Sequence, residues 1–313
     1  YRLNETHMTA SIWVLGEALM DCVAQPDGTL RPFMGGSPFN MARAAALRGA
    51  TVGYVNPLST DQFGQGMHQQ LVQDGVIPLS APSALPTSLA VVQIHNGQPS
   101  YGFYREGIAD RDYSADAVLQ RLQGQAPGVL HTGSLLLVPP EHHKVLDILK
   151  GAKSLGWTIS IDVNLRPRLA ADLGQYVRAV QEIAEHADWL KASDEDLELL
   201  GFPHATRANG AAIAANFMAH GTSRVALTFG AQGAWLGVEG NSADADVPAT
   251  QVVDTVGAGD TFWGNCLGDW VLNPEDAHQR VAQTLHQAMR AAAINCERAG
   301  CQPPRYAEVL AAA

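Results

Sequence analysis

Short apolar or β-branched segments alternate with longer helical patterns along most of this 313-residue chain. The strand-like segments are IWVLG, TVGYV, GVLHTG, TISIDV, ADWLKA, RVALTFG and AWLGV. The helical patterns, each broken near Gly or Pro, predict helices over residues 38–47, 62–73, 140–155, 173–186 and 207–220. This alternation implies right-handed crossovers and a mostly parallel sheet. We therefore expect a doubly wound α/β fold with helices on both faces of the sheet.

Two segments, at about 20–34 and 86–112, interrupt the alternation. They contain Asp27-Gly28 and Asn96-Gly97, dipeptides that tolerate the positive φ angles of tight hairpin turns. We expect these hairpins to form a small β-sheet lid on a single domain that comprises residues 1–313. An ordinary surface hairpin or a subunit contact fits the same pattern. Because exposed strand edges tend to be covered, a homodimer through the lid is a further expectation.

The composition limits the possible partners and the compartment. Twenty basic against 31 acidic side chains give a formal net charge of −11, so we expect no nucleic-acid or membrane partner. No apolar run approaches the ~18 residues of a membrane span. Four cysteines without a C-x-x-C pair are typical of a reduced cytoplasm. The patternless segment 1–8 is interpreted as an addition to the natural chain, which would begin near Met8.

The segment DTVGAGDTFWG, residues 254–264, predicts an anion site. Gly257 and Gly259 let successive N–H groups converge, and the helical pattern from Asp260 places them at a helix N-terminus. A phosphoryl group bound there would have Asp260 beside the attacking hydroxyl. Asp260 could equally serve only the helix dipole, which is worth ~0.3 to 1 kcal/mol. The chain has neither a P-loop nor a dinucleotide fingerprint in a strand-to-helix context.

A second glycine-rich segment, GGSPFNMARAAALRG at residues 35–49, predicts a well-specified helix. We expect Ser37 as its N-cap, Pro38 as its first helical residue and Gly49 as its C-cap. Asn40 lies within the first turn, where the preceding glycines leave room for a ligand.

Further polar residues follow strands. Asp21 comes after the first strand, and DVNLRPR places Asp162, Asn164 and Arg166 at the end of another. Single polar residues at strand ends more often cap loops than bind ligands. Because crevice residues of α/β sheets gather at the carboxyl ends of strands, this group is nevertheless a candidate pocket.

These segments resemble the signatures of a known family. GGSPFNMARAAALRGATVGYV is similar to the N-terminal signature of the ribokinase-like (PfkB) carbohydrate kinases, and DTVGAGDTFWG is similar to their C-terminal signature. The likeness extends from VLGEALMD to AAAINCERAGCQPP. It implies a single α/β domain with a β-sheet lid, and transfer of the γ-phosphoryl group of ATP to a sugar hydroxymethyl group with Mg²⁺.

The resemblance also implies roles for individual residues. Asp260 would be the catalytic base, with the backbone of Gly257, Ala258 and Gly259 as anion hole and Arg166 at the phosphoryl group or substrate. The expected sugar contacts are Asp21, Gly35, Gly36, Asn40, Arg105 and Asn164. The expected ATP contacts are Lys191, Ser193, Thr228, Gly230, Gly233, Gly257, Gly259 and Asn295. Backbone near Asp254 and Val256 is a candidate K⁺ site.

The chain departs from the family pattern at one place. The N-x-x-E motif, associated with the magnesium water network, is replaced by Ser193-Asp194-Glu195-Asp196. The shorter Asp196 side chain could still reach Mg²⁺ through water, or Glu195 or Asp194 could share the role. The same residues also predict a helix start capped by Ser193.

Several functions fit this pattern. We expect an ATP-dependent sugar kinase, with fructose as the favoured substrate because YGFYREGIAD resembles the lid strand of fructokinases. A 2-keto-3-deoxygluconate kinase is the first alternative, since Arg105 and Arg166 together could bind a carboxylate. A nucleoside or aminoimidazole riboside kinase is the next. A non-catalytic nucleotide- or sugar-binding protein is an alternative of another class.

Overall fold

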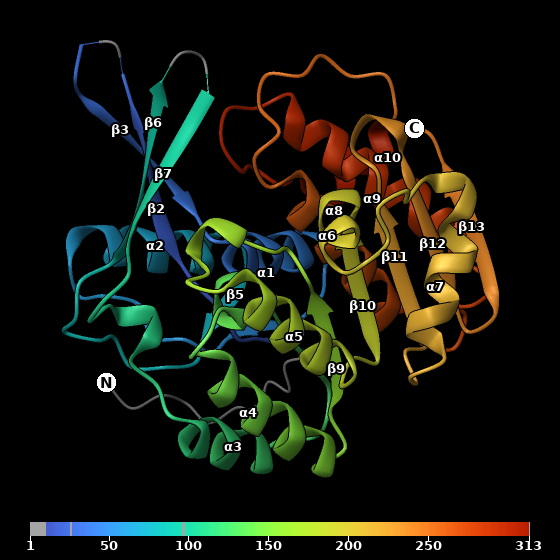
Figure 1. Ribbon diagram of the computed structural model, residues 1–313, viewed down its shortest axis with the longest axis horizontal. Helices are drawn as coiled ribbons and strands as arrows, with labels where there is room; N and C mark the ends of the chain where they lie inside the picture. The colour runs from blue at the N-terminus through green and yellow to red at the C-terminus, as the bar shows by residue number, and fades with distance from the viewer. Residues whose placement is uncertain (1–10, 26, 96–97, 313) are drawn as a thin grey trace.

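The computed structural model describes residues 11–25, 27–95 and 98–312. Its body is a nine-stranded sheet in the order β13-β12-β11-β10-β9-β8-β1-β4-β5 (Figure 1). The strands are β1 (Ile12–Val14), β4 (Val52–Tyr54), β5 (Val76–Pro78), β8 (Val129–Gly133), β9 (Thr158–Asp162), β10 (Trp189–Ser193), β11 (Arg224–Thr228), β12 (Ala234–Val238) and β13 (Asn241–Ala245). Strands from β5 to β11 pair in parallel, and β12 and β13 are antiparallel. The expected mostly parallel sheet is confirmed.

Helices cover both faces of this sheet. One face carries α1 (Ser37–Arg48), α2 (Gln62–Gln73), α8 (Ala258–Leu272) and α9 (Val281–Cys296), with α10 (Tyr306–Ala311) packed on α9. The other carries α3 (Ala115–Gln123), α4 (His142–Ser154), α5 (Leu173–Ala184), α6 (Asp194–Leu199) and α7 (Gly210–Met218). Successive β1 side chains alternate between the two cores, since Ile12 and Val14 join the first and Trp13 the second. Among the described residues, no helix has the length and apolar character needed to cross a membrane.

The predicted helices are present, with small differences at their ends. The helix at 62–73 has the expected bounds, whereas the one expected at 207–220 opens with a 3₁₀ turn, Arg207–Asn209, before α7 begins. The sequence patterns do not predict β5 or β13. The edge strand β13 reads NSADA, and small and acidic residues have little preference for strands.

A separate four-stranded sheet, called the lid below, projects beside α1 and α2 (Figure 1, upper left). It consists of β2 (Leu19–Ala24), β3 (Leu30–Gly35), β6 (Ser88–His95) and β7 (Gln98–Tyr104), in the order β3-β2-β6-β7. Gly28 has a φ of +83° in the turn between β2 and β3, and Asp27 Oδ1 accepts the Thr29 N–H at 2.9 Å. The Asn96-Gly97 turn and the segment 1–8 lie outside the described residues. After β7 the chain returns to the body through a 3₁₀ turn, Ala109–Arg111.

Candidate active site

The candidate site lies where the strand order of the main sheet reverses. The chain runs from β1 to β4 and β5 in one direction, and from β8 to β11 in the other, so the carboxyl ends of β1 and β8 flank the switch point. The β1 exit leads through Glu17 into the lid, and α1 and α8 cross nearby. Gly264 makes that crossing close, since an added Cβ would lie 2.7 Å from the Met41 carbonyl oxygen.

Asp260 lies in the first turn of α8 and is held by two side chains of α1. Its Oδ1 accepts the Ser37 hydroxyl at 2.7 Å, and its Oδ2 accepts the Asn40 amide at 2.9 Å. Burial raises the pKa of Asp260 above its ordinary value, although both hydrogen bonds oppose the shift. The charges of Lys191 and Arg166 also favour the carboxylate. Asp260 is thus a buried, oriented carboxylate that can accept a hydrogen bond from a hydroxyl.

The prediction of Ser37 as the N-cap of α1 is wrong. Gly36, with a φ of +105°, occupies the N-cap without a side-chain cap, and Ser37 and Pro38 are the first two helical residues. The Ser37 hydroxyl is instead committed to Asp260. The Gly49 C-cap is confirmed, with a φ of +116°.

The turn before Asp260 has the geometry of an anion hole. Gly257 is the N-cap of α8 with a φ of +74°, and no side chain caps the helix. In the part of the chain that the structure describes, the N–H groups of Gly259 and Asp260 have no hydrogen-bond acceptor. These groups are therefore free to bind an anion. An added Cβ at Gly257 would lie 2.2 Å from the Cys301 sulfur. Both the positive φ angle and this lack of space therefore require glycine at position 257.

Asp21 faces the same space from the lid strand β2. Burial raises its pKa to about 6, which Arg166 opposes and Asp260 and Asp254 reinforce. A Cβ at Gly35 would lie 2.2 Å from Asp21 Oδ2, so the β3 backbone leaves just enough room for the carboxylate. The predicted sugar contacts Asp21, Gly35, Gly36 and Asn40 thus lie together near Asp260.

Lys191 reaches the anion hole from β10. A Cβ at Gly259 would lie 3.3 Å from its Nζ, and its ammonium group contacts both oxygens of Asp162 at 2.8 and 2.9 Å. Burial lowers the pKa of Lys191, but Asp162 and Asp196 outweigh it and the net shift is upward. Lys191 is therefore a charged group beside the expected phosphates. Its pairing with Asp162 was not predicted, although Asp162 had been singled out.

Arg166 and Asn164 follow β9. The Arg166 Nη1 donates to Asn164 Oδ1 at 2.6 Å, and Asn164 has a φ of +37°, unusual for a residue other than glycine. The Arg166 charge acts on both Asp21 and Asp260. Arg166 thus lies between the two sides of the candidate pocket.

Arg105 lies at the base of the lid. Its Nη2 is 3.5 Å from Asp110 Oδ2, and its side chain is 11% exposed. Its expected contact with the sugar stays a prediction, because no ligand is present to test it.

The residues expected around the nucleotide lie on neighbouring loops. Ser193 and Thr228 pair across β10 and β11, and Gly230 and Gly233 lie in the turn from β11 to β12. Asn295 is fully buried in α9, where it donates to the Val256 carbonyl at 2.8 Å and accepts the Gln302 N–H at 2.8 Å. Asn295 therefore holds the loop in front of the anion hole.

Two apolar residues of that loop were not predicted. Val252 and Val253 are 60% and 64% exposed, and Val256 is 44% exposed. Adjacent exposed apolar side chains are a candidate contact surface for a ligand. The sequence string QVVDTV contains them, but it does not show that the loop is exposed.

The metal ligands are less well defined. Asp196 accepts hydrogen bonds at both oxygens, from the Leu165 N–H at Oδ1 and from the Ser193 N–H and hydroxyl at Oδ2. The expected Ser193 cap of α6 is thereby confirmed. Asp254 accepts the N–H groups of Val256 and Gly300. Within the described ranges, no group of three or more His, Cys, Asp or Glu side chains could hold a metal ion.

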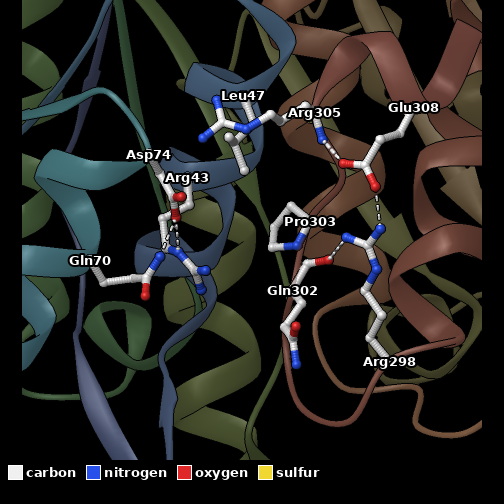
Figure 2. Close-up of a pocket in the computed structure, with 9 residues that line it drawn as sticks. All are labelled: Arg43, Leu47, Gln70, Asp74, Arg298, Gln302, Pro303, Arg305 and Glu308. Atoms are coloured by element: carbon white, nitrogen blue, oxygen red, sulfur yellow. Dashed lines mark hydrogen bonds and ion pairs between the residues drawn. The ribbon is translucent and has the colours of Figure 1, made fainter.

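A cavity of about 320 Å³ lies on the other side of the α8 N-terminus (Figure 2). Arg43 lines it and donates to Asp74 at 2.7 Å and to the Cys301 carbonyl at 3.1 Å. Arg298 is paired with Glu308 on the opposite side of the cavity from Arg43 (Figure 2). Arg43 and Arg298 already have partners, and Asp260 does not line this cavity. The cavity is therefore not the candidate active site.

Comparisons with known proteins agree with this arrangement. The model of the pfkB family carbohydrate kinases matches residues 9–307. A fructokinase from Rhizobium leguminosarum bv. trifolii is 31% identical over 283 residues, which cover 88% of this chain and 84% of the relative. A 2-dehydro-3-deoxygluconokinase from Bacillus subtilis is 28% identical over 265 residues, which cover 79% of this chain and 78% of the relative. The crystal structure of a fructokinase from Xylella fastidiosa with bound ATP has a TM-score of 0.79 and 25% sequence identity to this chain. The match covers 96% of this chain and 97% of the fructokinase.

Proposed function

The chain belongs to the pfkB family of carbohydrate kinases and is an ATP-dependent sugar kinase, and we propose that fructose is the sugar that it phosphorylates. The observation that carries the choice is the acidic character of the pocket, where the charges of Asp260 and Asp254 raise the pKa of Asp21 and Arg166 opposes them. Such a pocket favours a neutral polyol over an acid. The fructokinase relatives at about 30% identity support the same choice.

In the proposed reaction, Asp260 receives a hydrogen bond from the terminal hydroxymethyl group of the sugar. That oxygen attacks the γ-phosphorus of ATP, the bond to the β,γ-bridging oxygen breaks, and ADP leaves. The hydroxyl proton passes to Asp260, whose oxygens are already held in place by Ser37 and Asn40. The free backbone N–H groups of Gly259 and Asp260 stabilise the charge on the phosphoryl oxygens.

The sugar would be held by the lid and by α1. Asp21 can accept two hydroxyl hydrogen bonds, and the Asn40 Oδ1 is buried without a partner among the described residues. Gly35 and Gly36 allow the sugar ring to approach the backbone, and Asn164 would contact it from the β9 side. These assignments agree with one another because all these groups converge near Asp260.

The nucleotide would lie across the ends of β10 and β11. Lys191, beside Gly259, would bind the β- and γ-phosphates, with Arg166 at the transferred group. Ser193, Thr228, Gly230 and Gly233 would border the rest of the nucleotide, with Asn295 behind the loop. Val252 and Val253 would pack against the adenine ring, because they offer exposed apolar surface at this position.

Two ions are part of the proposal. Mg²⁺ bound to ATP neutralises phosphate charge, and ordinarily needs only one or two protein carboxylates besides phosphates and water. Asp196 fits that limited role through water. Its Oδ1 accepts one hydrogen bond, from the Leu165 N–H, and keeps a second lone pair for a water molecule. Backbone carbonyl groups near Asp254 and Val256 would take K⁺.

A panel of sugars tests the proposed substrate. Release of ADP is measured with ATP and Mg²⁺ for fructose, ribose and 2-keto-3-deoxygluconate, with the Asp260→Asn variant as the control for background hydrolysis. We expect the highest kcat/KM for fructose. A preference of tenfold or more for the keto acid would replace fructose by an acidic sugar and assign Arg105 and Arg166 to its carboxylate.

A further inference from the structure

Three charged side chains that the reaction above does not use are buried together at the base of the lid. Glu17 is 0% exposed, Asp110 is 2% exposed, and the Arg105 side chain is 11% exposed. Arg105 lies 3.5 Å from Asp110 and within electrostatic reach of Glu17. This group of three is called the lid-base cluster below. Burying three charges is costly unless they have a function or excellent pairing.

The pairing within the lid-base cluster is incomplete. Glu17 Oε2, Asp110 Oδ1 and Arg105 Nε have no hydrogen-bond partner in the described part of the chain. Burial raises the pKa of Glu17 to about 7 and that of Asp110 to about 6, although Arg105 opposes both shifts. A group built only for stability would satisfy these atoms, so a role in function is the better explanation.

Glu17 is connected to the catalytic carboxylate through one residue. Its Oε1 accepts the Ser37 backbone N–H at 3.2 Å, and the Ser37 hydroxyl donates to Asp260 at 2.7 Å. Ser37 is the first residue of α1 and has no side-chain cap in front of it. Glu17, which lies outside the helix, therefore accepts a hydrogen bond from a free N–H group at the start of α1, as an N-cap side chain would.

The same cluster is connected to the lid. Arg105 directly follows β7, and Glu17 lies two residues before β2, so two lid strands enter the body here. Asn56 adds a bridge, because it accepts the Gly16 N–H at 2.7 Å and donates to the Asp110 carbonyl at 2.8 Å. The lid-base cluster thus lies between the lid and the α1 terminus.

We propose that Glu17 is a positioning residue for phosphoryl transfer. It holds Ser37, and through Ser37 the Asp260 carboxylate, in a fixed position relative to Arg105 at the end of the lid strand β7. This inference rests on the proposed role of Asp260. Glu17 does not touch the sugar, because it is fully buried behind α1. Its effect is on the orientation of the carboxylate, to which proton transfer is sensitive.

A set of variants tests the proposal by steady-state kinetics. Glu17→Met removes the acceptor for the Ser37 N–H and keeps the side-chain length. We expect kcat to fall about tenfold, with KM for sugar and for ATP within about threefold. Glu17→Gln retains an acceptor oxygen and should keep kcat within about threefold of the wild type. Glu239→Gln, at the ion pair with Arg224 away from the lid, is the matched control and should change kcat less than about twofold.

A double-mutant cycle separates positioning from a general loss of structure. Ser37→Ala should also lower kcat about tenfold, and the double variant Glu17→Met/Ser37→Ala should be no worse than about twentyfold, because both act through the same contact. A hundredfold, additive loss would overturn the proposal, as would a Glu17→Met enzyme with kcat within twofold of the wild type.

A second substitution covers failure of the methionine variant to fold. Glu17→Asp keeps the charge but withdraws the oxygen by one methylene, and should show the same loss of kcat and the same non-additivity with Ser37→Ala. Normal kcat in Glu17→Asp would overturn the proposal. The Asp260→Asn control distinguishes the two levels: if that enzyme is fully active, the proposed role of Asp260 fails, and if it is inactive while Glu17 variants are normal, only this inference fails.

Discussion

The first turn of α8 and the lid meet at the same pocket but are built in opposite ways. Every residue of α8 from Asp260 to Trp270 is buried, and the helix packs closely on α1 and α9. The lid is anchored through fewer apolar side chains: Met20 and Cys22 of β2 join a main core cluster, and Leu19 and Ala90 pack with Leu135 of the body. Leu30 on its edge strand is 50% exposed. The chemistry is therefore placed on the rigid element and the sugar contacts on the weakly anchored one.

The difference shows what each region needs. Phosphoryl transfer requires a carboxylate whose position does not vary, and packing around α8 supplies that. A sugar must enter and a product must leave, so the covering sheet has few apolar contacts to break. The buried charges between the two, Glu17, Arg105 and Asp110, add polar contacts between regions that few apolar side chains of the lid join. The predictions below test this division, beginning with the largest effect.

The substitution Asp260→Asn should leave the fold and ATP binding intact and lower kcat by at least about a hundredfold. The amide keeps the size of the side chain and one acceptor for the two donors of α1, but it no longer accepts the proton. Turnover is measured together with ATP affinity by calorimetry. If kcat stayed near normal, the rigid side of the pocket would not contain the base.

The substitution Asp21→Ala should raise KM for the sugar about tenfold or more and change KM for ATP less than about threefold. The truncated side chain leaves two sugar hydroxyl hydrogen bonds unmade, each worth ~0.5 to 1.5 kcal/mol. Asp27→Ala, at the exposed turn of the same hairpin, is the control. Equal weakening of both substrates would indicate a folding defect, and the lid would lose its assigned role.

Much of the rigid region could be predicted from sequence, because local rules decide it. The glycines at 257 and 259 and the helical pattern after Asp260 specify an anion hole without knowledge of the rest of the fold. The strand and helix alternation likewise predicts the sheet. The family resemblance then brings Asp21 and Asn40 to the same pocket, which the structure agrees with.

Contacts between distant segments could not be predicted. Ser37 has the sequence signature of an N-cap. Only the packing of α8 against α1 shows that its hydroxyl instead donates a hydrogen bond to Asp260. Glu17 lies in the apolar run VLGEALM, where a single acidic residue is an available signal, but its neighbours Arg105 and Asp110 come from the segment after the last lid strand, about 90 residues further along the chain. Long-range packing, not local propensity, creates these groups.

The pH dependence offers a subtler test of the lid side. Because the pKa of Asp21 is raised to about 6, the carboxylate that binds sugar forms above that pH and is lost below it. We expect kcat/KM for the sugar to fall about fivefold between pH 6 and pH 5. In Asp21→Asn that acid limb should disappear or shift to lower pH. An unchanged limb would assign it to another group, such as Asp260.

Protein stability should show the opposite trend with pH. Glu17, Asp21, Asp110 and Asp162 all have raised pKa values, at about 7, 6, 6 and 6. The folded state thus binds more protons than the unfolded state between about pH 4 and pH 7, so these groups stabilise the fold less as pH rises. We expect Tm, measured by calorimetry, to decline by several degrees from pH 5 to pH 8. A rising Tm would contradict the assigned shifts.

The smallest effect is expected at the outer edge of the lid. Leu30 begins β3, which is an edge strand, and an exposed leucine beside unpaired backbone groups is a natural subunit contact. If the lid forms a homodimer, Leu30→Lys should shift the monomer–dimer equilibrium toward monomer in sedimentation velocity. The kcat should stay within about twofold of the wild type, because Leu30 lies away from Asp260 and surface substitutions rarely change stability by more than ~0.5 kcal/mol. A wild-type enzyme that sediments as a monomer, or a dimer that the substitution leaves unchanged, would exclude this edge as the interface. A large loss of kcat with intact folding would show that the edge of the lid takes part in the reaction, and the division between a rigid catalytic turn and a weakly anchored cover would have to be redrawn.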